Sequence, residues 1–201
     1  VYPHIDIATC TRLGIIVSSS QHPGTPSYAT AQLTFGLILA AMRQIPQQMA
    51  ALKSGTCQIG IGRTLRGLTL GIYGYGRIGS ALAEYGKAFG MDVLVWSRQR
   101  GRDAAAAAGF ATVATKEELF RRSDVLTLAI RLVPETRGTI TAADLASMKP
   151  GSLFVNTARD GLDAMRRAVG EGSRSFDSLH AEFVRHASPL RQEMQAALSM
   201  P

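Results

Sequence analysis

The pattern of apolar and polar positions changes near residue 69, and the two parts of the chain predict different elements. An apolar run at residues 14–18 predicts a strand, and the turn-rich segment 19–27 follows it. A long helix is expected over residues 28–52, because apolar side chains recur at helical spacing. The positions on its apolar face are Leu33, Leu37, Ala40, Ala41 and Ile45. Because proline lacks a backbone N–H, Pro46 is expected to kink this helix or end its first part.

From residue 69 onward, short continuous apolar runs alternate with amphipathic segments. The predicted strands are residues 70–73, 93–96, 111–113, 125–130 and 153–156. The predicted helices are residues 78–89, 103–108, 116–121 and 141–148. Parallel neighbouring strands need crossover connections, and strands buried on both faces are apolar throughout. The pattern therefore predicts an α/β fold with a doubly wound, mostly parallel sheet.

The alternation stops after Leu162, and this sets the expected domain boundary. A chain of 201 residues can bury one good core. We expect residues 1–162 to form that domain, with the leading strand and long helix in 1–54 and the alternating core in 66–162. Residues 163–201 contain helical pieces between Gly- and Ser-rich breaks. They predict an atypical helical or poorly ordered tail.

A glycine motif lies between the predicted strand at 70–73 and the helix that follows. Its residues are Gly74, Tyr75, Gly76, Arg77, Ile78 and Gly79. In such a motif the first glycine makes a tight turn, the second lets the backbone approach a pyrophosphate, and the third lets the helix pack close to the strand. The helix N-terminus adds free N–H groups and partial positive charge. A glycine-rich turn alone is weak evidence, but the strand–turn–helix context predicts that these residues bind a dinucleotide.

The end of the second strand of this unit bears on which dinucleotide is bound. An acidic residue there would bind the adenosine ribose and repel a 2′-phosphate. This chain has Ser97 at that position, followed by Arg98. A hydroxyl and a guanidinium can accommodate a 2′-phosphate. The cofactor is therefore expected to be NAD(P), with NADP favoured over NAD, while a solvated basic loop beside an NAD site stays an alternative.

The charge of the chain does not by itself indicate a nucleic-acid partner. The formal net charge is +7 and the pI is near 9.9, but the basic residues are scattered without a long basic run. An anionic small ligand explains local positive charge equally well. No apolar run reaches the length of a membrane span, and Cys10 and Cys57 have no metal-ligand spacing. We expect no nucleic acid, no membrane, no metal and a cytoplasmic location.

Several further segments match one family in the same order along the chain. They are residues 67–71, 87–91, 134–138, 148–151 and 155–159. Together with the glycine motif, they resemble the cofactor domain of the D-2-hydroxyacid dehydrogenases, which include phosphoglycerate dehydrogenases and glyoxylate/hydroxypyruvate reductases. The resemblance covers residues 14–162, about three quarters of the chain.

The resemblance implies a reaction and a set of site residues. Members of this family transfer a hydride between a nicotinamide and the hydroxyl-bearing carbon of a small 2-hydroxy acid. Arg159 matches the arginine that holds the substrate carboxylate and polarises its carbonyl, which makes it the expected catalytic residue. Thr136, Thr157 and Arg159 would border the nicotinamide half of the cofactor. The helix that begins at Tyr28 resembles the element through which the family's cofactor domains pair, so a homodimer is possible.

The chain also departs from the family. Its catalytic Glu and His are not identifiable here, and Glu182 and His186 are expected to form an ordinary surface pair on a tail helix. The segment after Leu162 lacks the family's usual Val-Asp-Glu start, and no substrate domain is recognisable. We therefore expect a truncated or frame-altered cofactor-binding portion that is weak or inactive alone. The alternative is a non-catalytic NAD(P)-binding module.

Overall fold

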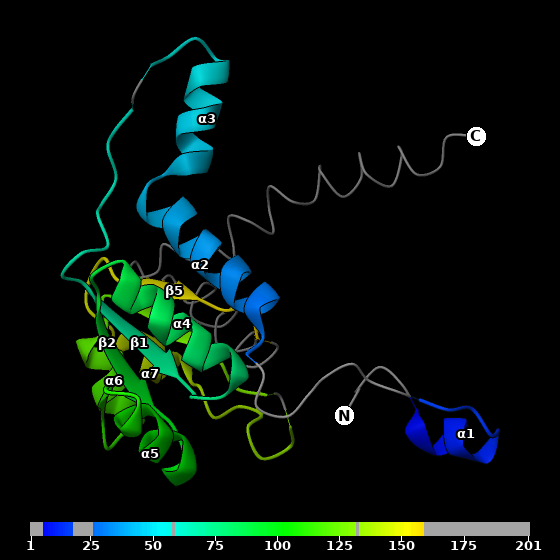
Figure 1. The fold of residues 1–201 in the computed structure, drawn as a ribbon. Coiled ribbons are helices and arrows are strands. Elements are labelled where there is room, and N and C mark those ends of the chain that lie inside the picture. The colour runs from blue at the N-terminus through cyan, green and yellow to red at the C-terminus, as the bar shows by residue number, and fades with distance from the viewer. Residues whose placement is uncertain (1–5, 18–25, 58, 132, 159–201) are drawn as a thin grey trace, which may run out of the picture.

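A computed structural model describes residues 6–17, 26–57, 59–131 and 133–158 of the chain (Figure 1). Its centre is a five-stranded parallel sheet with the strand order β3-β2-β1-β4-β5. The strands are β1 (Thr69–Tyr73), β2 (Asp92–Trp96), β3 (Ala111–Thr112), β4 (Val125–Leu128) and β5 (Leu153–Val155). The predicted α/β class and parallel sheet are confirmed. The strand order reverses beside β1, which is where ligands bind in open sheets of this kind.

Helices cover both faces of the sheet. Those of the alternating region are α4 (Arg77–Ala88), α5 (Gln99–Ala107), α6 (Lys116–Arg122) and α7 (Ala142–Ala146). On one face, Ile72 packs in a core cluster with side chains of α4 and of the earlier helix α2 (Tyr28–Met42), and on the other Tyr73 packs with side chains of α6 and α7. Successive residues of β1 therefore enter different cores, which is why most positions of the central strands are apolar.

The predicted long helix is divided into α2 (Tyr28–Met42) and α3 (Ile45–Lys53). Gln44 has a φ of 53°, in the left-handed region, and Pro46 lies in the first turn of α3. This confirms that the first part of the helix ends before Pro46, since a left-handed residue cannot continue a right-handed helix. Figure 1 shows α2 crossing the sheet beside α4, while α3 extends beyond the sheet.

Two predictions for the N-terminal part were wrong. The buried side of α2 contains Ala31, Thr34, Phe35, Ile38 and Met42. On the predicted apolar face, Leu33 is 57% exposed, and Leu37 and Ala41 are only partly buried against the core. Helix α2 is apolar on most of its sides, so periodicity could not choose the face. Residues 14–17 form no strand but follow a short helix, α1 (Ile7–Arg12), and Ile16 is 92% exposed. An apolar run forms a strand only beside a pairing partner, and the described sheet has none next to it.

Two ion pairs fix the connections on the α6 and α7 side of the sheet. Asp144 accepts hydrogen bonds from Lys116 Nζ at 2.8 Å and from the Thr141 backbone N–H at 2.8 Å, which closes a capping box at the start of α7. Burial raises the pKa of Asp144, but the hydrogen bonds from Lys116 and Thr141 outweigh burial and leave that pKa below its ordinary value. Asp124 is held similarly by Lys149 and the Thr69 backbone N–H.

Candidate functional site

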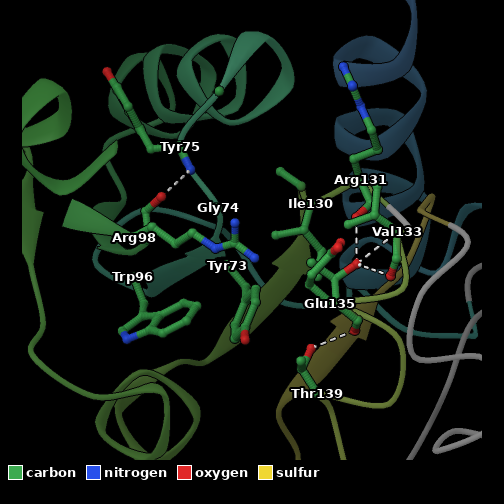
Figure 2. Close-up of a pocket in the computed structure, with 14 residues that line it drawn as sticks. Tyr73, Gly74, Tyr75, Trp96, Arg98, Ile130, Arg131, Val133, Glu135 and Thr139 are labelled. Carbon is green, nitrogen blue, oxygen red and sulfur yellow. Dashed lines mark hydrogen bonds between the residues drawn. The ribbon is translucent and has the colours of Figure 1, made fainter. Parts of the chain in front are cut away.

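A pocket of about 440 Å³ opens at the carboxyl edge of the sheet (Figure 2). Its walls come from the end of β1 and the glycine turn (residues 73–76), the end of β2 (residues 96–98) and the loop that follows β4. That loop contributes residues 129–131, Val133, Glu135, Thr136 and Thr139. The pocket therefore spans the point where the strand order reverses.

The three glycines of the motif have different steric surroundings. Gly74 has a φ of 106°, and a Cβ there would lie 2.9 Å from the carbonyl oxygen of Ala129. A Cβ on Gly79 would lie 2.1 Å from the carbonyl oxygen of Gly74, so α4 and the end of β1 are in backbone contact. A Cβ on Gly76 would meet no atom within 4 Å, although Gly76 lines the pocket. The backbone at Gly76 is thus accessible from the pocket at the N-terminus of α4.

The end of β2 is joined closely to the glycine turn. The Tyr75 backbone N–H donates to Ser97 Oγ at 3.3 Å, and a Cβ on Gly101 would lie 2.1 Å from the same oxygen. The Ser97 hydroxyl therefore supports the turn and retains its own proton for another acceptor. Figure 2 shows the Arg98 side chain extending toward the middle of the pocket, and this residue is exposed.

The remaining pocket surface is largely aromatic and aliphatic. The rings of Tyr73 and Trp96 have centroids 4.4 Å apart, and both residues line the pocket with Ile130 and Val133. Glu135 adds a carboxylate that the sequence did not assign to the site, although its neighbour Thr136 was expected there. An apolar pocket with a few polar groups suits a flat heterocycle attached to polar groups.

The structure brings together only some of the residues predicted for the site. Gly74, Tyr75, Gly76, Ser97, Arg98 and Thr136 line the pocket. Thr136 Oγ1 accepts from the Val133 N–H at 2.9 Å and donates within the same loop, so it shapes the pocket wall. Ile78 instead packs against the core.

Other predicted residues lie elsewhere. The Arg77 carbonyl accepts from the Ser27 N–H at 2.9 Å, which joins the starts of α4 and α2. Thr157 follows β5 and contacts α2. Arg159, Glu182 and His186 lie outside the described residues. Among the described residues there is no cluster of side chains that could hold a metal ion, and none of their helices is long and apolar enough to span a bilayer.

Comparison with known proteins identifies the family to which this arrangement belongs. Residues 35–196 match the model of the D-isomer specific 2-hydroxyacid dehydrogenase, NAD binding domain. The chain belongs to this family. The glycine turn and the pocket beside it therefore lie in a domain that binds a nicotinamide dinucleotide. The matched range includes most of residues 163–201, so the boundary of the expected tail stays a prediction.

Individual relatives of this NAD-binding domain are enzymes of related activities. A glyoxylate reductase of Aeropyrum pernix is 39% identical over 183 residues, which are 85% of this chain and 54% of that protein. A D-3-phosphoglycerate dehydrogenase of Methanocaldococcus jannaschii is 39% identical over 84% of this chain and 33% of its own length. The crystal structure of a putative D-3-phosphoglycerate dehydrogenase from Ralstonia solanacearum has 46% identity and a TM-score of 0.76, over 87% of this chain and 54% of that one. The chain thus spans about a third to a half of the length of these proteins.

The different surroundings of Gly76 and Gly79 predict separable effects of adding one methyl group. Gly79→Ala should destabilise the fold by about 2 kcal/mol or more, because the backbone of Gly74 must move away. Gly76→Ala should cost about 1 kcal/mol or less but weaken NADH binding about tenfold or more, because the methyl group occupies the space that a phosphate would approach. Urea unfolding and NADH fluorescence titration measure the two effects. Unchanged NADH affinity in Gly76→Ala would contradict this position for the pyrophosphate.

Proposed function

We propose that this chain is the cofactor-binding part of an NAD(P)-dependent oxidoreductase that interconverts a small 2-keto acid and its 2-hydroxy acid. The observation that supports this most is the pocket at the reversal of the strand order, which contains the accessible backbone of Gly76. The names of the relatives, glyoxylate reductase and D-3-phosphoglycerate dehydrogenase, support an acid of this class.

The residues of the pocket suggest how the cofactor would be held. The pyrophosphate would lie at the N-terminus of α4, against residues 76–79, and the adenosine ribose beside Ser97. Thr136 and Thr157 would border the nicotinamide half. When bound, the reduced nicotinamide supplies a hydride for the carbonyl carbon. Arg159 is proposed to bind the carboxylate of the acid and polarise its carbonyl.

The preference for NADP rests on the end of β2. Residues 97–100 contain no carboxylate that would repel a 2′-phosphate. Ser97 Oγ accepts from the Tyr75 N–H and keeps a proton to donate, and the Arg98 guanidinium extends into the pocket (Figure 2). Together they offer a hydroxyl and a planar pair of donors to an anion.

Titration with NADPH and NADH tests this preference. NADPH should bind more tightly to the wild-type chain, and Arg98→Gln should weaken NADPH binding about tenfold while changing NADH binding by about twofold or less, because only NADPH loses a charge-assisted hydrogen bond. Arg121→Gln, which alters an exposed arginine of α6 outside the pocket, is the matched control. Tighter binding of NADH, or equal losses for both cofactors in Arg98→Gln, would overturn the NADP assignment.

The alternative function is a non-catalytic NAD(P)-binding module, which the unidentified catalytic Glu and His favour. An assay of NADPH and NADH oxidation with glyoxylate, followed by the absorbance of the reduced nicotinamide, separates the two functions. We expect slow turnover, because general acid–base catalysis contributes about 10² to 10⁴ in rate and no catalytic Glu or His is identified in this chain. Arg159→Ala should abolish this turnover, because Arg159 is proposed to bind the acid and polarise its carbonyl. Cofactor binding with no turnover, or turnover unaffected by Arg159→Ala, would favour the non-catalytic module.

We also propose a homodimer that pairs through α2 and α3. Helix α3 has no buried residue, and Ile45, Met49 and Leu52 recur on one side of it at 45%, 55% and 70% exposure. Such an apolar side needs a partner surface.

Light scattering after size-exclusion chromatography should give a dimer mass for the wild-type chain. Met49→Glu should shift that mass to the monomer, because a carboxylate would be buried in the contact. Leu13→Glu alters another exposed apolar residue, just beyond α1, and should leave the dimer intact. A monomeric wild-type chain, or a dimer that survives Met49→Glu, would exclude this interface.

A further inference from the structure

A hydroxyl contact joins α2 to the chain immediately after β5. Thr34 Oγ1 lies 2.7 Å from Thr157 Oγ1 and 2.8 Å from the carbonyl oxygen of Thr30. Thr34 is fully buried. A carbonyl oxygen only accepts, so the single proton of the Thr34 hydroxyl goes to Thr30. Thr157 must then donate its own proton to Thr34, and the direction of this contact is fixed.

Successive side chains of β5 point to opposite sides of the sheet, and this alternation continues past the last paired residue of the strand to Thr157. Val155 belongs to the core cluster on the α2 and α4 side, and Phe154 belongs to the cluster on the opposite side. Thr157 points to the same side as Val155, while Ala158 packs against the opposite cluster. The last residue of β5 in the ladder is Val155, which is aligned with Thr127 of β4. Residues 156–158 therefore depend on side-chain contacts for their position.

Two such contacts hold this segment from different directions. Asn156 Oδ1 accepts from the Ala158 N–H at 2.9 Å, which closes a local turn. Thr157 contacts Thr34, which is 123 residues distant in the sequence. The first contact fixes the curvature of the segment, and the second fixes its distance from α2. Helix α2 is itself tied to α4, because the Ser27 N–H donates to the Arg77 carbonyl at 2.9 Å.

The strand order shows which part of a dinucleotide this segment would meet. The glycine turn follows β1, and the adenosine ribose belongs at the end of β2 on one side of it. The other half of the molecule must then extend over the ends of β4 and β5, on the opposite side of β1. Thr157 is the second residue after β5.

We propose that Thr34 is a positioning residue for the nicotinamide half of the cofactor. It acts through Thr157, whose hydroxyl it holds so that residues 156–158 border the end of β5 at a fixed distance from α4. This inference rests on the proposed dinucleotide function. It predicts that loss of the Thr34 hydroxyl weakens the binding of the nicotinamide half of the cofactor and leaves the binding of the adenosine and pyrophosphate unchanged.

The test compares NADH with ADP-ribose, which has the adenosine and pyrophosphate but no nicotinamide. Calorimetric titration of the wild-type chain should show tighter binding of NADH than of ADP-ribose. Thr34→Val keeps the shape of the side chain and removes the hydroxyl. It should reduce the ratio of the two affinities about fivefold, the effect of one ordinary hydrogen bond, and change ADP-ribose binding by about twofold or less.

Matched variants separate positioning from general loss of structure. Thr34→Ser retains the hydroxyl and should restore the wild-type ratio. Thr157→Val should reproduce Thr34→Val, and the double variant should be no worse than either single variant, because all three lack the same contact. Thr127→Val removes a fully buried threonine hydroxyl that has no hydrogen-bond partner in the described structure, and it should leave the ratio unchanged.

The outcomes distinguish this inference from the proposed function. A wild-type chain that binds neither ligand would overturn both. Retained ADP-ribose binding with a wild-type ratio in Thr34→Val would overturn only the positioning role, as would equal affinities of the wild-type chain for NADH and ADP-ribose. Should Thr34→Val fail to fold, Thr157→Val answers the same question at a half-buried position.

Discussion

The carboxyl edge of the sheet, where the pocket opens, depends on the backbone contact between α4 and the end of β1. Because Gly79 approaches the carbonyl oxygen of Gly74 so closely, a side chain at that position would separate the helix from the sheet. The contact places the first turn of α4 next to Gly76, which lines the pocket, and the backbone N–H groups of a first helical turn carry partial positive charge. A side chain at position 79 would move these groups, so one small residue determines where an anion could bind.

The order of the strands determines on which side of this contact the other pocket residues lie. The end of β2 brings Ser97 and Arg98 to one side of the glycine turn, and the loop after β4 brings Ile130, Val133 and Glu135 to the other. The Arg98 guanidinium thus lies on one side of the glycine turn, and an apolar surface with the Glu135 carboxylate lies on the other. This local arrangement has more bearing on ligand choice than the net charge of the chain, which is spread over its whole length.

Helix α2 connects two segments at the carboxyl edge of the sheet, the start of α4 and the chain after β5. Its start is tied to α4 through Ser27 and Arg77, and Thr34 ties it to the chain after β5. The apolar composition of α2 permits both a buried side against the sheet and exposed apolar positions such as Leu33. One helix can therefore contact α4 and the chain after β5 while it leaves apolar side chains exposed, as α3 also does.

The sequence by itself determined the alternating elements from residue 69 onward and the position of the glycine turn between β1 and α4. These follow from local rules, because continuous apolar runs bounded by glycine turns have few other stable conformations. Their ends shifted by a few residues: β4 ends at Leu128 rather than at 130, and α5 starts four residues earlier than the 103 predicted. The residues after Leu128 leave the ladder to form a pocket wall.

Only the tertiary structure decided which side of α2 is buried, that residues 14–17 join no strand of the described sheet, and that Thr34 meets Thr157. Each of these depends on what lies beside the segment in space. An apolar run becomes a strand only next to another strand, and a helix that is apolar on most sides buries the side that the sheet covers. A hydrogen bond between residues 123 positions apart leaves no periodic trace in the sequence, since it exists only once the sheet has brought its two partners together.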